Sequence, residues 1–222
     1  MSVKPLVATP CYASMLCVNY VTSVIRLRTA CSQIGMPLEF YFRQDSLITR
    51  ARNDCAAYFL AGDYTHLFFI DADIGFEPKA ALRLLHSGHD VVAGVYHKRA
   101  EGAGFTVDPA DVGPVDANGF ARTHEAPTGF MCIARHALER IARMRPDLRC
   151  MSEGSAQHRF FDPMVDPETA RYLSEDYAFC RLWAEAGGEV HIDARSDLTH
   201  QGTRLYSGNF YDALRERPPE SQ

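Results

Sequence analysis

The stretch "HLFFIDADIGFEP" (residues 66–78) decides the fold. It begins with a short aromatic and aliphatic run that has the length and composition of a buried strand. The run ends at two carboxylates, Asp71 and Asp73, which one residue separates. Open α/β sheets bind their ligands at the carboxyl ends of the strands. The stretch therefore predicts a central strand over 66–70 that presents two carboxylates at a ligand site.

Short apolar runs alternate with longer amphipathic segments through the first half of the chain. The runs predict strands over 6–9, 39–42, 66–70 and 91–95, and the longer segments predict helices over 18–35, 46–62 and 77–88. Each helical segment ends at a glycine placed as a C-cap. Strands and helices that take turns in this way indicate an α/β fold with a mainly parallel central sheet.

The second half of the chain is less regular. Gly, Pro and Asp dominate residues 102–119, which predicts a loop or hairpin excursion, and ordered segments resume over 128–144. A polar stretch over 149–169 precedes a predicted helix over 174–188 and a strand over 189–193, and residues 215–222 read as a frayed end. No repeat or linker divides the 222 residues, so we expect a single domain over 1–222.

Composition narrows the class of partner. A formal net charge of −5 and the scattering of Arg among Asp and Glu leave no basic stripe for a nucleic-acid backbone, so we expect no nucleic-acid partner. The seven cysteines include no C-x-x-C pair, which is typical of reduced thiols in the cytoplasm. The sequence shows no signal pattern and no run of roughly 18 apolar residues. We therefore expect a cytoplasmic protein, and peripheral attachment to a membrane remains open.

The carboxylate pair itself has three interpretations. Asp71 and Asp73 are either turn formers or helix caps, but the next helix is predicted to start only at Pro78, too far on for either to cap it. Two adjacent carboxylates repel each other unless a cation lies between them, which favours a site for Mg²⁺ or Mn²⁺. A strand that ends in D-x-D is also how a haloacid-dehalogenase-type phosphatase presents an aspartate nucleophile. That family usually has Thr or Val where this chain has Gly75.

Further motifs occur in a fixed order around this strand. They are "VATPCY" (7–12), "ARND" (51–54), "FFIDADIGFEP" (68–78), "TGF" (128–130), "SEDYAF" (174–179) and "THQG" (199–202). The ordered set, which extends over about residues 5–203, resembles the GT-A-fold nucleotide-sugar glycosyltransferases of the broad family-2-like group. The resemblance implies a GT-A, Rossmann-like αβα sandwich. It also implies a nucleotide-binding part over about 1–100 and an acceptor-binding part over about 101–215.

The resemblance implies a metal-dependent hexosyltransferase, which moves a sugar from a nucleotide-diphosphate donor to a glycan or other hydroxyl acceptor, as in polysaccharide or glycoconjugate assembly. The cofactor would be a divalent metal, Mn²⁺ or Mg²⁺, that stabilises the charge on the leaving diphosphate. On this pattern Asp73 is the direct metal ligand and His200 a third contact. Asp71 shares the metal shell or holds the ribose.

The remaining motif residues acquire roles in the same way. Thr9, Arg52 and Gly129 are expected to bind the nucleotide sugar. Asp176 is expected to be the general base of an inverting transfer, with Glu175 beside it to orient hydroxyl groups. The local alternative is that "SED" is a helix start, in which an N-cap serine precedes two acids that the helix dipole favours.

The acceptor does not follow from the resemblance. "HKR" (97–99) and the excursion over 102–119 fall where acceptor specificity varies in such enzymes. Lys98 and Arg99 either neutralise a diphosphate or anionic acceptor, or they form an ordinary solvated basic pair. A module that binds a nucleotide sugar without turnover is a third functional hypothesis, beside the transferase and the phosphatase. The oligomeric state is not predicted.

Overall fold

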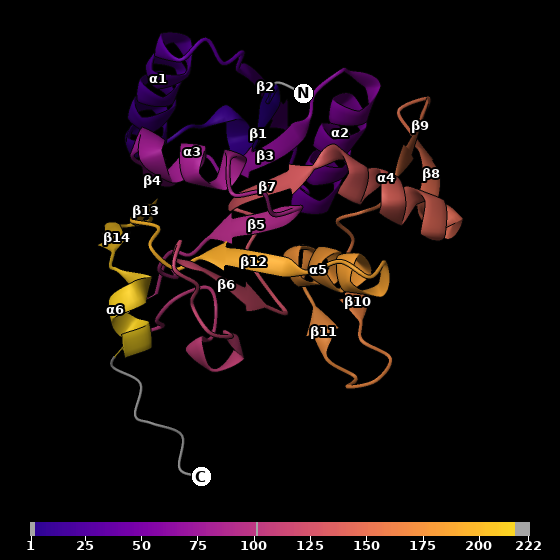
Figure 1. Ribbon diagram of the computed structural model, residues 1–222. Helices are drawn as coiled ribbons and strands as arrows, with labels where there is room; N and C mark the ends of the chain where they lie inside the picture. The colour runs from indigo at the N-terminus through magenta and orange to yellow at the C-terminus, as the bar shows by residue number, and fades with distance from the viewer. Residues whose placement is uncertain (1–2, 101, 216–222) are drawn as a thin grey trace.

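A seven-stranded sheet forms the centre of the computed structural model, which describes residues 3–100 and 102–215 (Figure 1). The strand order is β2-β1-β3-β7-β5-β12-β6. The strands are β1 (Pro5–Cys11), β2 (Glu39–Gln44), β3 (His66–Ile70), β5 (Val91–Gly94), β6 (Phe120–Thr123), β7 (Phe130–Ala134) and β12 (Val190–Asp193). β6 and β7 run antiparallel to their neighbours, whereas the other strands share one direction.

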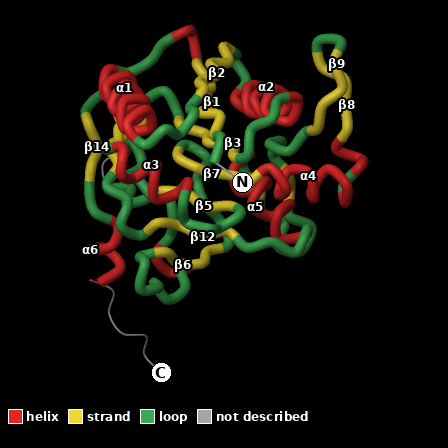
Figure 2. Tube along the Cα trace, turned by 45° about the horizontal axis from the view of Figure 1, so that its top comes forward, coloured by secondary structure: helices red, strands yellow, loops and turns green. Residues whose placement is uncertain are grey.

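Helices cover both faces of this sheet. They are α1 (Val18–Gln33), α2 (Ile48–Ala61), α3 (Pro78–Leu85), α4 (Arg135–Met144) and α5 (Glu175–Glu185), and a short α6 (Phe210–Arg215) lies near the C-terminus. One buried core joins α2, α4 and α5 to the sheet, and a second core joins α1 and α3 to the opposite face. Figure 2 shows these two helix groups on either side of the strands. The layers form the αβα sandwich expected from the sequence.

The apolar run of β3 explains why this strand lies inside the sheet. Leu67 and Phe69 pack into the core under α2, α4 and α5, whereas Phe68 and Ile70 pack into the core under α1 and α3. A strand with both faces covered needs apolar residues at consecutive positions. β7 is buried in the same way, with all five of its residues shielded from solvent.

A second, small sheet begins directly after the two aspartates. β4 (Ile74–Phe76) pairs antiparallel with β13 (Leu198–Gln201), which pairs in turn with β14 (Leu205–Ser207). In this register His200 lies opposite Ile74, the residue that follows Asp73. The small sheet therefore brings the late histidine of the sequence to the carboxylate pair.

Most expected elements are present with shifted ends. The strand over 66–70 has the expected bounds, while β1 and β2 each end two residues later than expected and β1 also begins one residue earlier. Gly35 and Gly88 follow their helices with φ of +66° and +80°, as a glycine C-cap requires. Gly62 stands at the cap of α2 with extended backbone, and a Cβ there would collide with the ring of Tyr64.

The irregular half contains more structure than the sequence predicts. The excursion over 102–119 has only a bridge between His97 and Phe105 and a 3₁₀ turn, η2 (Pro109–Asp111). The polar stretch over 149–169 contains the hairpin of β8 (Arg149–Ser152) and β9 (Ser155–His158), and β10 (Met164–Val165) pairs with β11 (Tyr172–Leu173). Short 3₁₀ turns, η1 (Tyr12–Ser14) and η3 (Pro146–Leu148), complete the elements. Residues 216–222 of the expected frayed end lie outside the described residues.

Two further predictions from the sequence concern the cysteines and membrane-spanning segments. All seven cysteines are free thiols, and most of them are buried. Across residues 3–100 and 102–215, no helix combines the length and apolar character needed to cross a membrane.

Candidate functional site

The two aspartates open onto a cavity of about 420 Å³ at the carboxyl edge of the sheet. Its walls come from the end of β1 and η1, the turn after β2 and the first turns of α2, with Tyr12 and Ile48 among the apolar contributors. Asp71, Asp73 and Arg99 also line the cavity, as does Asp45. The cavity therefore combines apolar and charged side chains, which suits a ligand with a ring system and an ionic group.

Asp73 lies between a histidine and an arginine. Its Oδ1 is 3.6 Å from Nε2 of His200, and its Oδ2 is 2.6 Å from Nη1 of Arg99. Burial alone would raise the pKa of Asp73, but His200 and Arg99 outweigh it, so the pKa lies below its ordinary value. Asp73 is therefore a carboxylate over the whole physiological range.

The other ring nitrogen of His200 is fixed by the backbone. Nδ1 lies 2.8 Å from the carbonyl oxygen of His97. Because a carbonyl only accepts hydrogen bonds, Nδ1 carries a proton, and in the neutral ring Nε2 is left with a lone pair. Nε2 and the Asp73 carboxylate are then two acceptors that face each other. A proton or a metal ion near both relieves their repulsion, and a backbone carbonyl behind a metal-binding histidine is a common support.

Arg52 does not line the cavity, contrary to its expected contact with the nucleotide. Only 2% of its surface is exposed, because it lies behind Asp71 over the ring of Phe69. Its Nη2 is 3.0 Å and 3.2 Å from the two oxygens of Asp71, and its Nε is 3.4 Å from Oε1 of Glu175. Arg52 therefore joins the first aspartate of D-x-D to the acid pair of "SEDYAF".

Gly129 supports Asp71 from the neighbouring strand. Its carbonyl accepts the backbone N–H of Asp71 at 2.9 Å. A Cβ on this residue would lie 2.9 Å from Oδ2 of Asp71 and would overlap the hydroxyl of Tyr96. Glycine is thus required here because the backbone approaches two functional side chains closely.

Tyr96 belongs to this cluster, although the sequence did not single it out. Only 6% of its surface is exposed, and its ring meets that of His200 edge-on with centroids 5.0 Å apart. Burial is the main reason that its pKa lies well above the ordinary value, and the nearby carboxylates, Asp71 first among them, add to the rise. Its hydroxyl is therefore protonated and available as a donor.

The acid pair begins α5, as expected. The Ser174 hydroxyl is hydrogen-bonded to the Asp176 side chain rather than to the helix backbone, so Ser174 occupies the N-cap position without capping through its side chain. Asp176 also accepts the N–H of Tyr177 at 2.9 Å. Burial raises the pKa of Glu175 and Asp176 adds to this, although Arg52 opposes it. The charges of Glu175 and Asp176 both favour a raised pKa of Arg52, and Asp176 also adds to the rise in the pKa of Tyr96.

Thr9 is the expected site residue that the structure keeps apart from the others. Its side chain is fully buried, and its hydroxyl is 2.6 Å from the hydroxyl of Tyr20 on α1. Thr9 faces that helix, whereas Pro10, Cys11 and the following Tyr12, at the end of β1 and just beyond it, line the cavity. The expected hydroxyl contact to a nucleotide is therefore already taken by Tyr20.

Within the part of the chain that the structure describes, no three His, Cys, Asp or Glu side chains converge as a complete metal site. Asp71 is turned toward Arg52 and Asp73 toward Arg99. The donor set of Asp73, Asp71 and the Nε2 lone pair of His200 suits a divalent ion whose remaining ligands come from a bound molecule. The residues thus fit a metal shared with a ligand such as a diphosphate.

No protein-family model and no curated protein matches the sequence. Solved structures do match in fold. A197 from STIV has 16% sequence identity and a TM-score of 0.51, over 93% of this chain and 95% of that one. A mutant of Drosophila beta-1,4-galactosyltransferase 7, in complex with manganese, UDP-Gal and xylobiose, has 11% identity and a TM-score of 0.51, over 99% of this chain and 76% of that one. At such identities the similarity concerns the fold alone. The chain therefore has the GT-A fold of nucleotide-sugar glycosyltransferases, a Rossmann-like αβα sandwich around a mostly parallel sheet.

Proposed function

We propose that this protein is a metal-dependent glycosyltransferase that moves a sugar from a nucleotide-diphosphate donor to a hydroxyl acceptor. The observation that carries the proposal is the pair of Asp73, which lines the cavity, and His200, whose Nε2 is 3.6 Å from Asp73 and whose Nδ1 is hydrogen-bonded to a backbone carbonyl. The GT-A fold supports it, and the Drosophila galactosyltransferase of that fold was solved with manganese and UDP-Gal.

The donor would lie along the 420 Å³ cavity. Its nucleoside would contact the apolar walls near Tyr12 and Ile48, and its diphosphate would lie at Asp73 and Arg99. Asp73, Asp71 and His200 would hold the divalent ion, which as a Lewis acid would stabilise charge on the leaving diphosphate. The Arg99 side chain is about half exposed, so it can exchange Asp73 for a phosphate oxygen without leaving a buried cation unpaired.

Asp176 is the proposed general base. In the transfer, the acceptor oxygen forms a bond to the anomeric carbon while the bond from that carbon to the diphosphate breaks, and Asp176 takes the acceptor proton. Attack from the face opposite the leaving group would invert the anomeric centre. Arg52 would position both ends of the reaction, because it contacts Asp71 on the donor side and Glu175 beside the base.

A thermal-shift screen tests the proposal. The full chain would be heated with UDP-, GDP-, CDP- and dTDP-sugars, each with and without Mn²⁺. A donor at about 100 times its Kd stabilises the folded state by about 2.7 kcal/mol, which corresponds to a rise in Tm of roughly 5–11 °C for a chain of this size. We expect such a rise for one donor with Mn²⁺, and its loss in Asp73→Asn but not in the control Asp63→Asn at the opposite edge of the sheet.

Turnover assays separate the competing functions. Mn²⁺-dependent hydrolysis or transfer of that donor supports the glycosyltransferase. Release of inorganic phosphate from simple phosphomonoesters, abolished by Asp71→Asn, would instead support the haloacid-dehalogenase-type phosphatase. Donor binding with no hydrolysis and no transfer to any of a broad set of acceptors would support the binding module. A protein that no nucleotide sugar stabilises, with or without metal, would contradict the proposal.

A further inference from the structure

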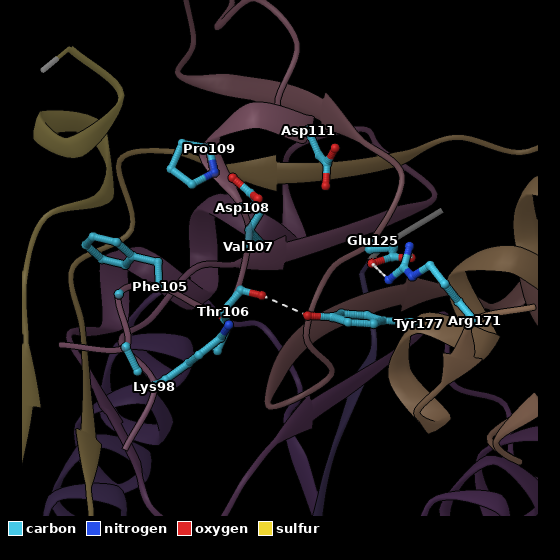
Figure 3. A pocket seen from close by; sticks show the side chains of 12 residues that line it. Lys98, Phe105, Thr106, Val107, Asp108, Pro109, Asp111, Glu125, Arg171 and Tyr177 are labelled. Carbon is cyan, nitrogen blue, oxygen red and sulfur yellow. Dashed lines mark hydrogen bonds and ion pairs between the residues drawn. The ribbon is translucent and has the colours of Figure 1, made fainter. Parts of the chain in front are cut away.

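A second cavity, of about 530 Å³, lies on the acceptor side of the chain (Figure 3). It reaches from Lys98, the neighbour of Arg99 in the sequence, to Tyr177, the neighbour of Asp176. The segment that forms its floor is tied to the candidate site, since the backbone and side chain of Thr106 both donate to the carbonyl of Tyr96. The cavity is therefore connected through Thr106 to Tyr96, which contacts His200 of the candidate site.

Two aromatic rings form fixed parts of its wall. The Tyr177 hydroxyl donates to the carbonyl of Thr106 at 3.0 Å, and burial raises the pKa of Tyr177 to about 12, so this hydrogen bond persists at any physiological pH. The ring of Phe105 packs against His97 and Phe210, with centroids 4.0 Å and 5.0 Å away. Rigid aromatic faces of this kind pack well against the C–H faces of a sugar ring.

One of the two cations of the wall is already paired with a carboxylate. Arg171 is held by Glu125 through two parallel contacts, Nη1 to Oε1 at 3.0 Å and Nη2 to Oε2 at 3.1 Å. A guanidinium whose fork is filled by a carboxylate has little left for a phosphate. Lys98 is then the cation that faces the cavity without this restriction.

The carboxylates of the wall have spare acceptor capacity. Asp108 uses one oxygen to accept the N–H of Ala110 at 2.8 Å, and Figure 3 shows Asp108 and Asp111 on the same side of the cavity. Each carboxylate offers about four acceptor positions, so hydroxyl donors can be satisfied here. An anionic group would instead meet like charge, which disfavours binding.

We propose that this cavity holds the acceptor and that the acceptor is an uncharged, hydroxyl-rich sugar unit, not a phosphorylated or carboxylated one. This inference rests on the proposed glycosyltransferase function. The volume suits one or two sugar rings, the rings of Phe105 and Tyr177 cover their apolar faces, and Asp108 and Asp111 accept their hydroxyl protons.

Pairs of neutral and charged glycosides test whether the acceptor is uncharged, and the test does not require the donor to be known. Ligand-observed NMR would compare the binding of neutral nitrophenyl hexosides and pentosides with that of nitrophenyl uronides and glycoside 6-phosphates to the full chain. We expect at least one neutral glycoside to bind, and its charged counterpart to bind at least tenfold more weakly. Replacing both acids, Asp108→Asn with Asp111→Asn, should reduce that preference to less than threefold.

Variants of the aromatic wall locate the binding. Tyr177→Ala should abolish binding of the neutral glycoside, and the milder Tyr177→Phe, which keeps the ring, should retain it. Asp63→Asn is the remote charge control, and circular dichroism verifies folding. The inference is overturned if a charged glycoside binds as tightly as its neutral counterpart, if no glycoside binds, or if binding survives Tyr177→Ala. Mn²⁺-dependent nucleotide binding, measured on the same samples, shows separately whether the proposed function stands.

Discussion

Replacing Arg52 by methionine would leave two carboxylates without the cation that they share. Methionine has a similar length and keeps the contact with Phe69, so the change removes mainly charge and hydrogen bonds. Asp71 loses its contacts at 3.0 Å and 3.2 Å, and Glu175 loses its contact at 3.4 Å. We expect a clear loss of stability and a large loss of activity.

The burial of the three groups sets the magnitude. The Arg52 side chain is 3% exposed, that of Glu175 17% and that of Asp71 28%. Breaking a buried ion pair by removing one partner costs about 3–5 kcal/mol, and the partial exposure of the acids places this case near about 3 kcal/mol. For a chain of this size the corresponding fall in Tm is roughly 6–12 °C.

The loss should also depend on pH. Burial already raises the pKa of Glu175, and Arg52 opposes the rise, so the variant raises this pKa further. An acid whose folded pKa is raised costs stability above that pKa and regains it as the pH falls and the group is protonated. The difference in unfolding free energy between wild type and variant should therefore be larger at pH 8 than at pH 5.

Urea denaturation followed by circular dichroism at both pH values measures this difference. Arg26→Met is the matched control, because the side chains of Arg26 on α1 and of its ion-pair partner Glu77 are both more than half exposed and solvent screens that pair. A loss below about 1 kcal/mol at pH 8, or an equal loss at both pH values, would refute the coupling of the two acids through Arg52.

Three further changes test other parts of the site. Gly129→Ala should remove most activity and lower Tm, because its Cβ would overlap the tyrosine hydroxyl beside it; Gly113→Ala, whose Cβ would make only an ordinary contact at 3.4 Å, is the control, and equal effects would contradict the packing argument. His200→Gln should raise the Mn²⁺ concentration for half-maximal donor binding by about 10–100-fold, and an unchanged Mn²⁺ titration would exclude His200 from the metal site. Burial raises the pKa of Cys180 to about 12, so peptide mapping should find it unalkylated by iodoacetamide at pH 8 in the native protein while Cys150 reacts; equal labelling would contradict this.

The central strand could be predicted from the sequence because its pattern is local. Residues 67–70 are buried on both faces, and the charged Asp71 directly follows the run, so composition gives the end of the strand. β7 has the same appearance but runs antiparallel to its neighbours. A strand covered on both faces looks alike in either direction, and the path of the chain between residues 95 and 129 decides which direction it takes.

The order of the motifs predicted which segments meet at the candidate site. It could not predict in which direction each side chain points, and that direction decides whether the side chain reaches the cavity. The order of motifs brought Asp73 and His200 into one expected site, and the pairing of β4 with β13 brings them 3.6 Å apart. Thr9 was expected at the nucleotide, but a shift of one residue along a strand moves a side chain to the other face. Arg52 was expected there too, and its position on α2 turns it under Asp71 instead. Tyr96 follows a strand end, where periodicity gives no direction.

β7 lies between β3 and β5 in the sheet, and this order affects how the chain folds during its synthesis. β3 ends at residue 70 and β5 begins at residue 91, yet each pairs with β7 at residues 130–134 and not with the other. A nascent chain that has emerged only to residue 100 therefore leaves one edge of β3 and both edges of β5 without a partner, and such edges are sites for chaperone binding or aggregation. The aspartates can reach their final positions only after β7 has been synthesised, so a fragment that ends near residue 100 is expected to be insoluble rather than a small nucleotide-binding protein.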